Sequence, residues 1–262
     1  ICRLAEEKFL MTINAANIDK DIDWIKTNAT DYDVDIEHLS DYYGQLAIQG
    51  PDSETIVTEV LGIPCQDLHF YEVKALHKDD EEIIISRTGY TGEDGFELYG
   101  SHKFIISQWD KLMASGRCKP CGLGCRDTLR FEVGLPLYGN ELSVEISPIM
   151  AGLGMFVKLE KTEFIGREAL LRQKTEGVAK RLRGIELDDN AIPRHGYNIL
   201  QNGAIIGQVT TGYRLISTNK SCAVALVDAS LKIGDRVEIQ IRKKTFPGTI
   251  VKKKFYEKHY HQ

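Results

Sequence analysis

The stretch SRTGYTGEDGFELYG, residues 86–100, indicates how the first part of the chain folds. It continues the run EEIII, residues 81–85, so that two β-rich segments, EEIIISRTGY and FELYG, flank the glycine-bounded acidic turn TGEDG. This arrangement is typical of a β-hairpin. In the second segment Phe96 and Leu98 share one face, and Glu97 and Tyr99 share the other. The pattern predicts an apolar face toward a core and a polar face that carries a carboxylate.

Helical patterns lie on both sides of this hairpin. The segment IDKDIDWIK, residues 18–26, places Ile18, Ile22 and Ile25 on one stripe after Asn17, a residue type that caps helices. SETIVTEVLG at 53–62 and FIISQWDKLMAS at 104–115 have the same periodicity. KPCGLGCRDTLRFEVG at 119–134 passes from a glycine-rich loop into a further helix. We therefore expect helices combined with a sheet in this part of the chain.

The character of the sequence changes from Arg181 onward. LRGIEL, YNILQNGAIIGQVTTG, CAVALVD and DRVEIQIRKKTFPGTIVKKKFY have the pattern of short strands, and Asn202-Gly203 is a strong hairpin signal. This part is expected to form a small all-β barrel, with a boundary near residues 176–181.

Composition narrows the classes of function. A chain of 262 residues with 42% hydrophobic residues can bury a sizeable core, and its net charge of -5 gives no reason to expect nucleic acid as a partner. The six cysteines are sparse and irregularly spaced, which favours reduced thiols, and no apolar run reaches membrane-spanning length. A soluble intracellular protein is expected. The chain starts at Ile1 without Met and soon enters the strand-like KFLMTI, so we also expect an opening portion to be missing.

Four stretches in this order resemble the T-protein, or aminomethyltransferase, family of the glycine cleavage system. They are NAANIDKDIDWI at 14–25, SRTGYTGEDGFELYG at 86–100, GLGCRDTLRFEVGLPLYGNEL at 122–142 and GLGMFVKLEKTEFIGREAL at 152–170. The resemblance implies an α+β, multidomain cloverleaf fold that binds folate and ends in a C-terminal all-β barrel. It implies a folate-binding region over 1–175, built from two interleaved α/β subdomains and lacking its N-terminal portion, and a barrel over 181–258.

The resemblance also implies a reaction. The family transfers the methylene unit of an aminomethyl group from the lipoyl arm of H-protein to tetrahydrofolate, which releases ammonia and gives 5,10-methylenetetrahydrofolate. The implied partners are lipoylated H-protein and the P- and L-proteins of the same system, with no metal, no nucleic acid and no membrane. The implied location is the bacterial cytoplasm, or the mitochondrial matrix in a eukaryote.

Asp21 is the candidate catalytic residue. It lies at the edge of the apolar stripe of its helix, where its ordinary role is that of an acid in the first turn, favoured by the helix dipole. By resemblance it matches the family's essential aspartate, which lies near the reactive nitrogens of the pterin. Cationic character develops on the methylene carbon during transfer, and a nearby anion stabilises it. We expect Asp21 to act first as an electrostatic and orienting group.

Four further residues match folate-binding or substrate-binding positions of the family. Glu97, otherwise an ordinary solvent-facing strand residue, is implied to bind the pteridine ring through a two-donor fork. Tyr90 is implied to line the pocket, although a turn tyrosine can also pack on its own hairpin. Arg126 is implied to bind folate, whereas its neighbours Asp127 and Arg130 form an i,i+3 pair. Tyr260 matches a substrate-binding tyrosine of some members.

Other signals do not support chemistry of their own. Cys118, Cys121 and Cys125 lack both the fold context of a redox pair and the second ligand pair of a zinc site. The seven histidines are scattered, and the GLG segments lack the context of a dinucleotide fingerprint. Met150 and Met155 depart from the common family pattern, which affects the expected domain packing rather than the pocket motifs.

Rival functions share the same fold. One is the C-terminal half of a dimethylglycine or sarcosine dehydrogenase, or a related folate-dependent demethylase. Another is the non-enzymatic folate-binding protein of iron-sulfur maintenance, which needs a cysteine where this chain has Glu163. A third is a bare folate-binding remnant.

Overall fold

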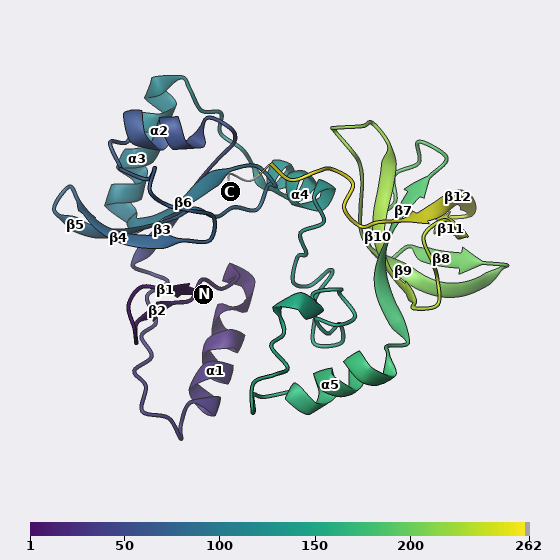
Figure 1. The fold of residues 1–262 in the computed structure, drawn as a ribbon. Coiled ribbons are helices and arrows are strands. Elements are labelled where there is room, and N and C mark those ends of the chain that lie inside the picture. The colour runs from purple at the N-terminus through teal and green to yellow at the C-terminus, as the bar shows by residue number, and fades with distance from the viewer. Residues whose placement is uncertain (260–262) are drawn as a thin grey trace. The chain divides into compact units, whose positions relative to one another are not determined.

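The computed structural model describes residues 1–259 (Figure 1). Its contacts divide the chain into two compact units. The first comprises residues 1–121 together with His259, and the second comprises residues 122–258. Hydrophobic cores form separately in the two units, one around the sheet of the first and two in the second.

The first unit is built on a four-stranded antiparallel sheet with the strand order β3-β6-β5-β4. Its elements are β1 (Cys2–Arg3), β2 (Phe9–Leu10), η1 (Ala15–Asn17), α1 (Ile18–Asn28), β3 (Tyr43–Gln49), α2 (Ser53–Glu59), β4 (Val73–Lys78), β5 (Glu81–Ser86), β6 (Gly95–Ser101) and α3 (His102–Ser115). Figure 1 shows α2 and α3 on the same side of the sheet. Phe96 and Leu98 point into the core beneath these helices, which confirms the predicted apolar face of β6.

The predicted hairpin is present, but its connection is longer than the sequence suggested. β5 ends at Ser86, and residues 87–94 form the connection to β6, so the prediction of a strand reaching Tyr90 was wrong. The reason lies in Arg87, whose side chain is only 2% exposed. Its Nε and Nη2 atoms donate to the two carboxylate oxygens of Asp94 at 3.0 and 2.6 Å, and its Nη1 donates to the Leu68 carbonyl at 2.9 Å. This fork closes the loop, and it raises the pKa of Arg87 above its ordinary value.

Helix α1 confirms the predicted stripe. Ile18, Ile22 and Ile25 are half-buried, and the positions between them are mostly exposed. Asn17 precedes the helix as predicted, but its side chain makes no capping hydrogen bond. Within the described part of the chain, no helix is both long and apolar enough to cross a bilayer. All six cysteines lie in that part, and all are free thiols.

The second unit contains the predicted barrel. Its elements are α4 (Leu123–Glu132), η2 (Gly154–Phe156), α5 (Arg167–Glu176), β7 (Lys180–Leu187), β8 (Asn198–Gln201), β9 (Ala204–Arg214), β10 (Ser221–Asp228), β11 (Arg236–Ile241) and β12 (Lys244–Val251). The six strands close in the order β10-β7-β12-β11-β8-β9. Asn202 and Gly203 both have positive φ, 52° and 81°, as a tight hairpin turn requires.

Polar groups also hold α4 against the barrel. Arg130, 1% exposed, donates to Asp127, to Glu141 at 2.6 Å and to Thr211 at 3.1 Å. Glu141 in turn accepts from both Thr210 and Thr211. The i,i+3 pair of Asp127 and Arg130 expected from the sequence is present, but it is only one part of a buried network.

Strand β12 pairs with β7 only from Gly248 to Val251, and its last partner on β7 is Gly184. A Cβ atom on Gly184 would lie 2.3 Å from the backbone oxygen of Lys252. Glycine is therefore needed where the chain leaves the barrel, because no larger side chain lets the two backbones approach so closely.

Substitution of the buried arginine tests the loop closure. We expect Arg87→Met to lower the free energy of unfolding by roughly 3–5 kcal/mol, because it leaves Asp94 buried without its charged partner. The control is Arg117→Met, which breaks the exposed pair with Glu59 and should cost less than about 1 kcal/mol. Urea denaturation followed by circular dichroism measures both values, and equal losses would contradict the assignment.

The close approach at Gly184 gives a second prediction. Gly184→Ala should destabilise the protein by roughly 1–3 kcal/mol, since the added methyl group forces the backbone apart. In Gly124→Ala, by contrast, the new Cβ meets no atom within 4 Å and lies in a helix, so stability should be unchanged or slightly higher. The difference between the two midpoints of thermal unfolding checks this, and a Gly184→Ala protein as stable as the parent contradicts it.

Candidate functional site

Glu97 lies on the polar face of β6, where three side chains hold its carboxylate. Its Oε1 accepts from Gln45 Nε2 at 3.0 Å, and its Oε2 accepts from Thr88 Oγ1 at 2.6 Å and from the Tyr99 hydroxyl at 3.2 Å. Thr88 is itself bonded to Ser86 at 2.9 Å. An ordinary solvent-facing strand residue does not collect three donors, so the carboxylate is held in one orientation.

These contacts leave limited room for a ligand on Glu97. A carboxylate has about four acceptor positions, two on each oxygen. The protein's own donors fill both positions on Oε2 and one on Oε1. One position on Oε1 is open, and a ligand with two parallel donors can form its second bond only if Thr88 or Tyr99 releases Oε2.

Tyr99 connects this site to the start of the chain. Burial, reinforced by the adjacent Glu97 carboxylate, raises the pKa of Tyr99 well above its ordinary range, so its hydroxyl remains a donor at neutral pH. The same hydroxyl interacts with the Thr12 side chain, and Cys2 lies close enough for Glu97 to contribute to the raised pKa of its thiol. The segment that leads into α1 therefore lies at the polar face of β6.

The loop that holds Tyr90 is packed around Gln49. The Gln49 amide donates to the Thr88 carbonyl at 3.0 Å and accepts from Thr91 Oγ1 at 3.1 Å. Cβ atoms on Gly89 and Gly95 would lie 1.8 and 2.4 Å from this amide, so a side chain at either position would force the Gln49 amide to move. Tyr90 itself is half-buried within this loop.

His259 contacts the same loop. The backbone N–H of His259 donates to the Gly92 carbonyl at 2.7 Å, and its ring Nδ1 lies 3.1 Å from Glu93 Oε1. Tyr260, predicted from the resemblance, lies outside the described residues.

Asp21 lies in the first turn of α1, on the half-buried side of the helix between the isoleucines. Its side chain is 33% exposed, and its Oδ1 lies 3.3 Å from the Nζ of Lys20. This position fits both interpretations of the residue, an acid favoured by the helix dipole and a carboxylate available to a ligand. Asp21 takes no part in the three hydrogen bonds that hold the Glu97 carboxylate.

Arg126 belongs to the second unit. It is exposed near the start of α4, and its backbone N–H donates to the Gly122 carbonyl at 3.1 Å. The structure therefore brings Glu97, Tyr90 and the chain leading to Asp21 into the first unit, whereas Arg126 is positioned by the second. Two cavities lie in the second unit, and none of the predicted site residues Asp21, Tyr90, Glu97 and Arg126 lines either of them.

Gln45, Gln49, Thr88 and Tyr99 are site residues that sequence reasoning missed. The motif at residues 86–100 contains Thr88 and Tyr99, and Tyr99 shares the face of Glu97. These two residues could therefore have been predicted from the sequence. Gln45 and Gln49 were not, because the register of β3 on β6 places Gln45 opposite Tyr99. No local pattern encodes that pairing.

The cysteines around residues 118–125 differ in their burial. Cys118 packs against the sheet core, and burial raises the pKa of its thiol, whereas Cys121 is exposed. Within residues 1–259 no group of three or more His, Cys, Asp or Glu side chains is arranged to hold a metal ion.

Comparison with known proteins identifies the family. The model of the GCVT N-terminal domain matches residues 1–161, and that of the glycine cleavage T-protein C-terminal barrel domain matches residues 180–257. The chain is 46% identical to an aminomethyltransferase of Thermoanaerobacter sp. (strain X514) over 265 residues, which covers 99% of this chain and 72% of that protein. It is 45% identical to an aminomethyltransferase of Lysinibacillus sphaericus (strain C3-41), covering 98% and 71%.

A solved structure agrees with this result. The crystal structure of the glycine cleavage system aminomethyltransferase T from Bartonella henselae superposes with a TM-score of 0.89 at 29% sequence identity, covering 95% of this chain and 69% of that one. The expected fold, a mixed helix and sheet region followed by a closed barrel, is thereby confirmed. From the two family models and these relatives, the chain belongs to the glycine cleavage T-protein, or aminomethyltransferase, family.

Proposed function

We propose that this protein transfers the methylene unit of an aminomethyl group, carried on the lipoyl arm of an H-protein, to tetrahydrofolate. The products are ammonia, 5,10-methylenetetrahydrofolate and the dihydrolipoyl H-protein. Membership of the family supports the reaction class. The observation that carries the proposal is the carboxylate of Glu97, held by three donors on a strand of the sheet.

The pterin ring is proposed to bind at the polar face of β6. Its amino group and ring N–H are donors that match a carboxylate, and the open position on Oε1 of Glu97 accepts the first of them. The second takes the place of the Tyr99 hydroxyl, whose bond to Oε2, at 3.2 Å, is longer than the 2.6 Å bond from Thr88. Tyr90, half-buried in the loop that begins beside Glu97, offers an aromatic face for the flat ring.

Asp21 is proposed to stabilise the cationic character that develops on the methylene carbon. Support comes from its place on the half-buried side of α1 and from the contact of Thr12 with Tyr99, which ties the preceding segment to the Glu97 face. The carboxylate is partly exposed, so it can reach a ligand. Arg126, an exposed guanidinium, is proposed to bind the carboxylates of the folate tail, with Tyr260 as a further substrate contact.

The rest of the assignment follows from the family. The partners are lipoylated H-protein and, in the same system, the P- and L-proteins. We propose a folate-binding region over 1–175 and a barrel domain over 181–258, and, because the relatives named above are bacterial, a cytoplasmic location. The alternative function, that of a demethylase on the same fold, uses a different donor substrate. Release of ammonia from aminomethylated H-protein therefore distinguishes the proposed transferase from a demethylase. Formaldehyde or methyl transfer from a methylated amine in place of this release would contradict the proposal.

Asp21→Asn should lose most of the transfer activity and keep tetrahydrofolate binding within a few-fold. An aimed charge of this kind lowers a barrier by roughly 3–4 kcal/mol, so ammonia release should fall by about two to three orders of magnitude. The matched control is Asp23→Asn, an exposed acid on the same helix, which should leave turnover unchanged. Turnover of Asp21→Asn equal to that of the control would remove Asp21 from the mechanism.

Removing different donors from Glu97 is expected to change the affinity for tetrahydrofolate in different ways. Thr88→Val removes the shortest bond to the carboxylate and should weaken tetrahydrofolate binding roughly tenfold, because Glu97 then loses the hydroxyl that fixes its orientation and must be ordered on binding. Tyr99→Phe frees a position on Oε2 and should leave binding unchanged or tighter. Isothermal titration calorimetry measures both, with Thr55→Val on the exposed side of α2 as the control. Equal losses in Thr88→Val and Tyr99→Phe would rule out the displacement of Tyr99.

A further inference from the structure

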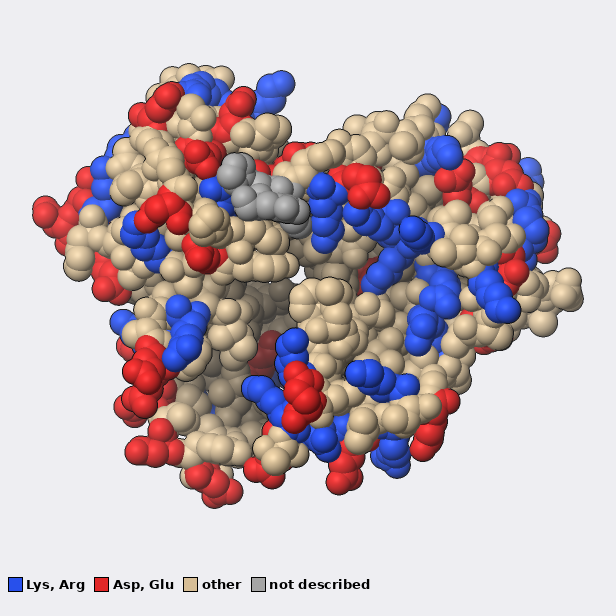
Figure 2. All heavy atoms as spheres, viewed as in Figure 1, with Lys and Arg blue, Asp and Glu red and all other residues tan. Residues whose placement is uncertain are grey.

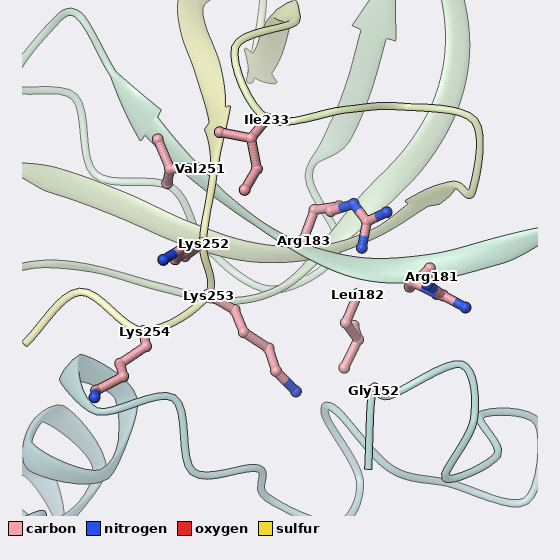
Figure 3. A pocket seen from close by; sticks show the side chains of 9 residues that line it. All are labelled: Gly152, Arg181, Leu182, Arg183, Ile233, Val251, Lys252, Lys253 and Lys254. Atoms are coloured by element: carbon pink, nitrogen blue, oxygen red, sulfur yellow. The ribbon is translucent and has the colours of Figure 1, made fainter. Parts of the chain in front are cut away.

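A cavity of about 400 Å³ opens beside β7 in the second unit, and the charged side chains that line it are all positive (Figure 3). Its five charged lining residues are all basic, and no carboxylate lines it. They are Arg181, Arg183, Lys252, Lys253 and Lys254. The chain as a whole has a net charge of -5, so this local excess runs against its composition. Figure 2 shows Lys and Arg side chains gathered on the face of the barrel unit in view.

The fold explains why this cavity exists. Strand β12 leaves β7 after the pair Val251 and Gly184, so the start of β7, which carries Arg181 and Arg183, is not covered by β12. The two arginines are two residues apart and therefore share a face of the strand. The chain after β12 then continues along the opposite wall as three consecutive lysines. Figure 3 shows the side chain of Lys253 extending toward Gly152 on the same side as Leu182.

Four of these five cations have no ion pair within residues 1–259, the exception being Lys254, which pairs with exposed Glu257. Burial, followed by repulsion from Arg181, lowers the pKa of Arg183, and burial lowers that of Lys253. The Glu141 carboxylate favours the charged form of Lys253. That carboxylate, however, already accepts hydrogen bonds from Arg130 and from two threonines. The Nε of Arg181 is buried and has no hydrogen-bond partner in the described part of the chain.

Arg183 Nε and Lys253 Nζ donate to the carbonyls of Leu231 and Ala151, which satisfies a donor but supplies no negative charge. The cluster is costly without a counter-ion, since like charges repel and the buried Nε of Arg181 lacks a bond. Guanidinium groups form paired hydrogen bonds with phosphate or carboxylate oxygens, and a lysine adds a point charge. The cations lie on two separate segments, so a ligand with several anionic groups can contact both. Leu182, Ile233 and Val251 supply apolar wall between them.

We propose that this cavity is a binding site for a small polyanion that carries two or more phosphate or carboxylate groups. The site is distinct from the residues assigned above to tetrahydrofolate. Binding at this site does not depend on the transfer reaction, so the site can be tested independently of the proposed function.

Calorimetric titration of the protein at low salt tests the site, with tripolyphosphate as the phosphate probe and citrate as the carboxylate probe. Saturable binding with one site per chain is expected for at least one probe, and the tighter of the two identifies the class. The double variant Arg181→Gln with Arg183→Gln should bind at least about tenfold more weakly, because it removes both guanidinium forks. Lys252→Gln, an exposed position on the other wall, should also bind more weakly while keeping the fold.

The matched control is the double variant Lys243→Gln with Lys244→Gln. Both lysines are exposed near the turn between β11 and β12, outside the cavity, and their loss changes the net charge by the same amount. Binding to the control should stay within about twofold of the parent, because the electrostatic effect of distant surface charges is screened. Equal weakening in both double variants, no saturable binding of either probe, or tighter binding of a single-stranded oligonucleotide that also needs Lys243 and Lys244 would overturn the proposal.

Discussion

The buried fork between Arg87 and Asp94 is the constraint on which the candidate site depends. Two parallel hydrogen bonds fix the ends of the 87–94 loop, and a third, to the Leu68 carbonyl, anchors the guanidinium below it. Because the pair is excluded from water, the loop cannot open without leaving charge unpaired in the core. Thr88 follows directly after this anchor, and its hydroxyl lies beside the Glu97 carboxylate as a result.

The polar face of β6 shows how neighbouring side chains fix the orientation of a strand carboxylate. A glutamate in a half-buried position ordinarily turns to solvent, but here Gln45, Thr88 and Tyr99 converge on it from three directions. The orientation of Glu97 is therefore fixed by the protein itself, which would lower the entropic cost of the proposed pterin binding. The same contacts limit the carboxylate to one open acceptor position, so the proposed binding of a two-donor ring requires an exchange of partners.

The second unit uses charge in two different ways. Around Arg130, Glu141 and the threonines of β9, every charged group has a partner, and the network ties α4 to the barrel. Beside the start of β7 five basic side chains line one cavity without a carboxylate, and burial lowers the pKa values of Arg183 and Lys253. Satisfied networks stabilise a fold, whereas an excess of positive charge in a cavity favours an anionic ligand.

The sequence alone determined the elements whose signal is local. The alternation of Phe96 and Leu98 with Glu97 and Tyr99 predicted the faces of β6, the isoleucine spacing predicted α1, and Asn202-Gly203 predicted a barrel hairpin. Tertiary structure decided the early end of β5, since Arg87 leaves the sheet to meet a carboxylate seven residues away. It also decided the partners of Glu97 and the convergence of Arg181 and Arg183 with the lysines at 252–254. The physical reason is that periodicity records which side of an element a residue faces, whereas strand register and chain crossing decide which distant residue it meets.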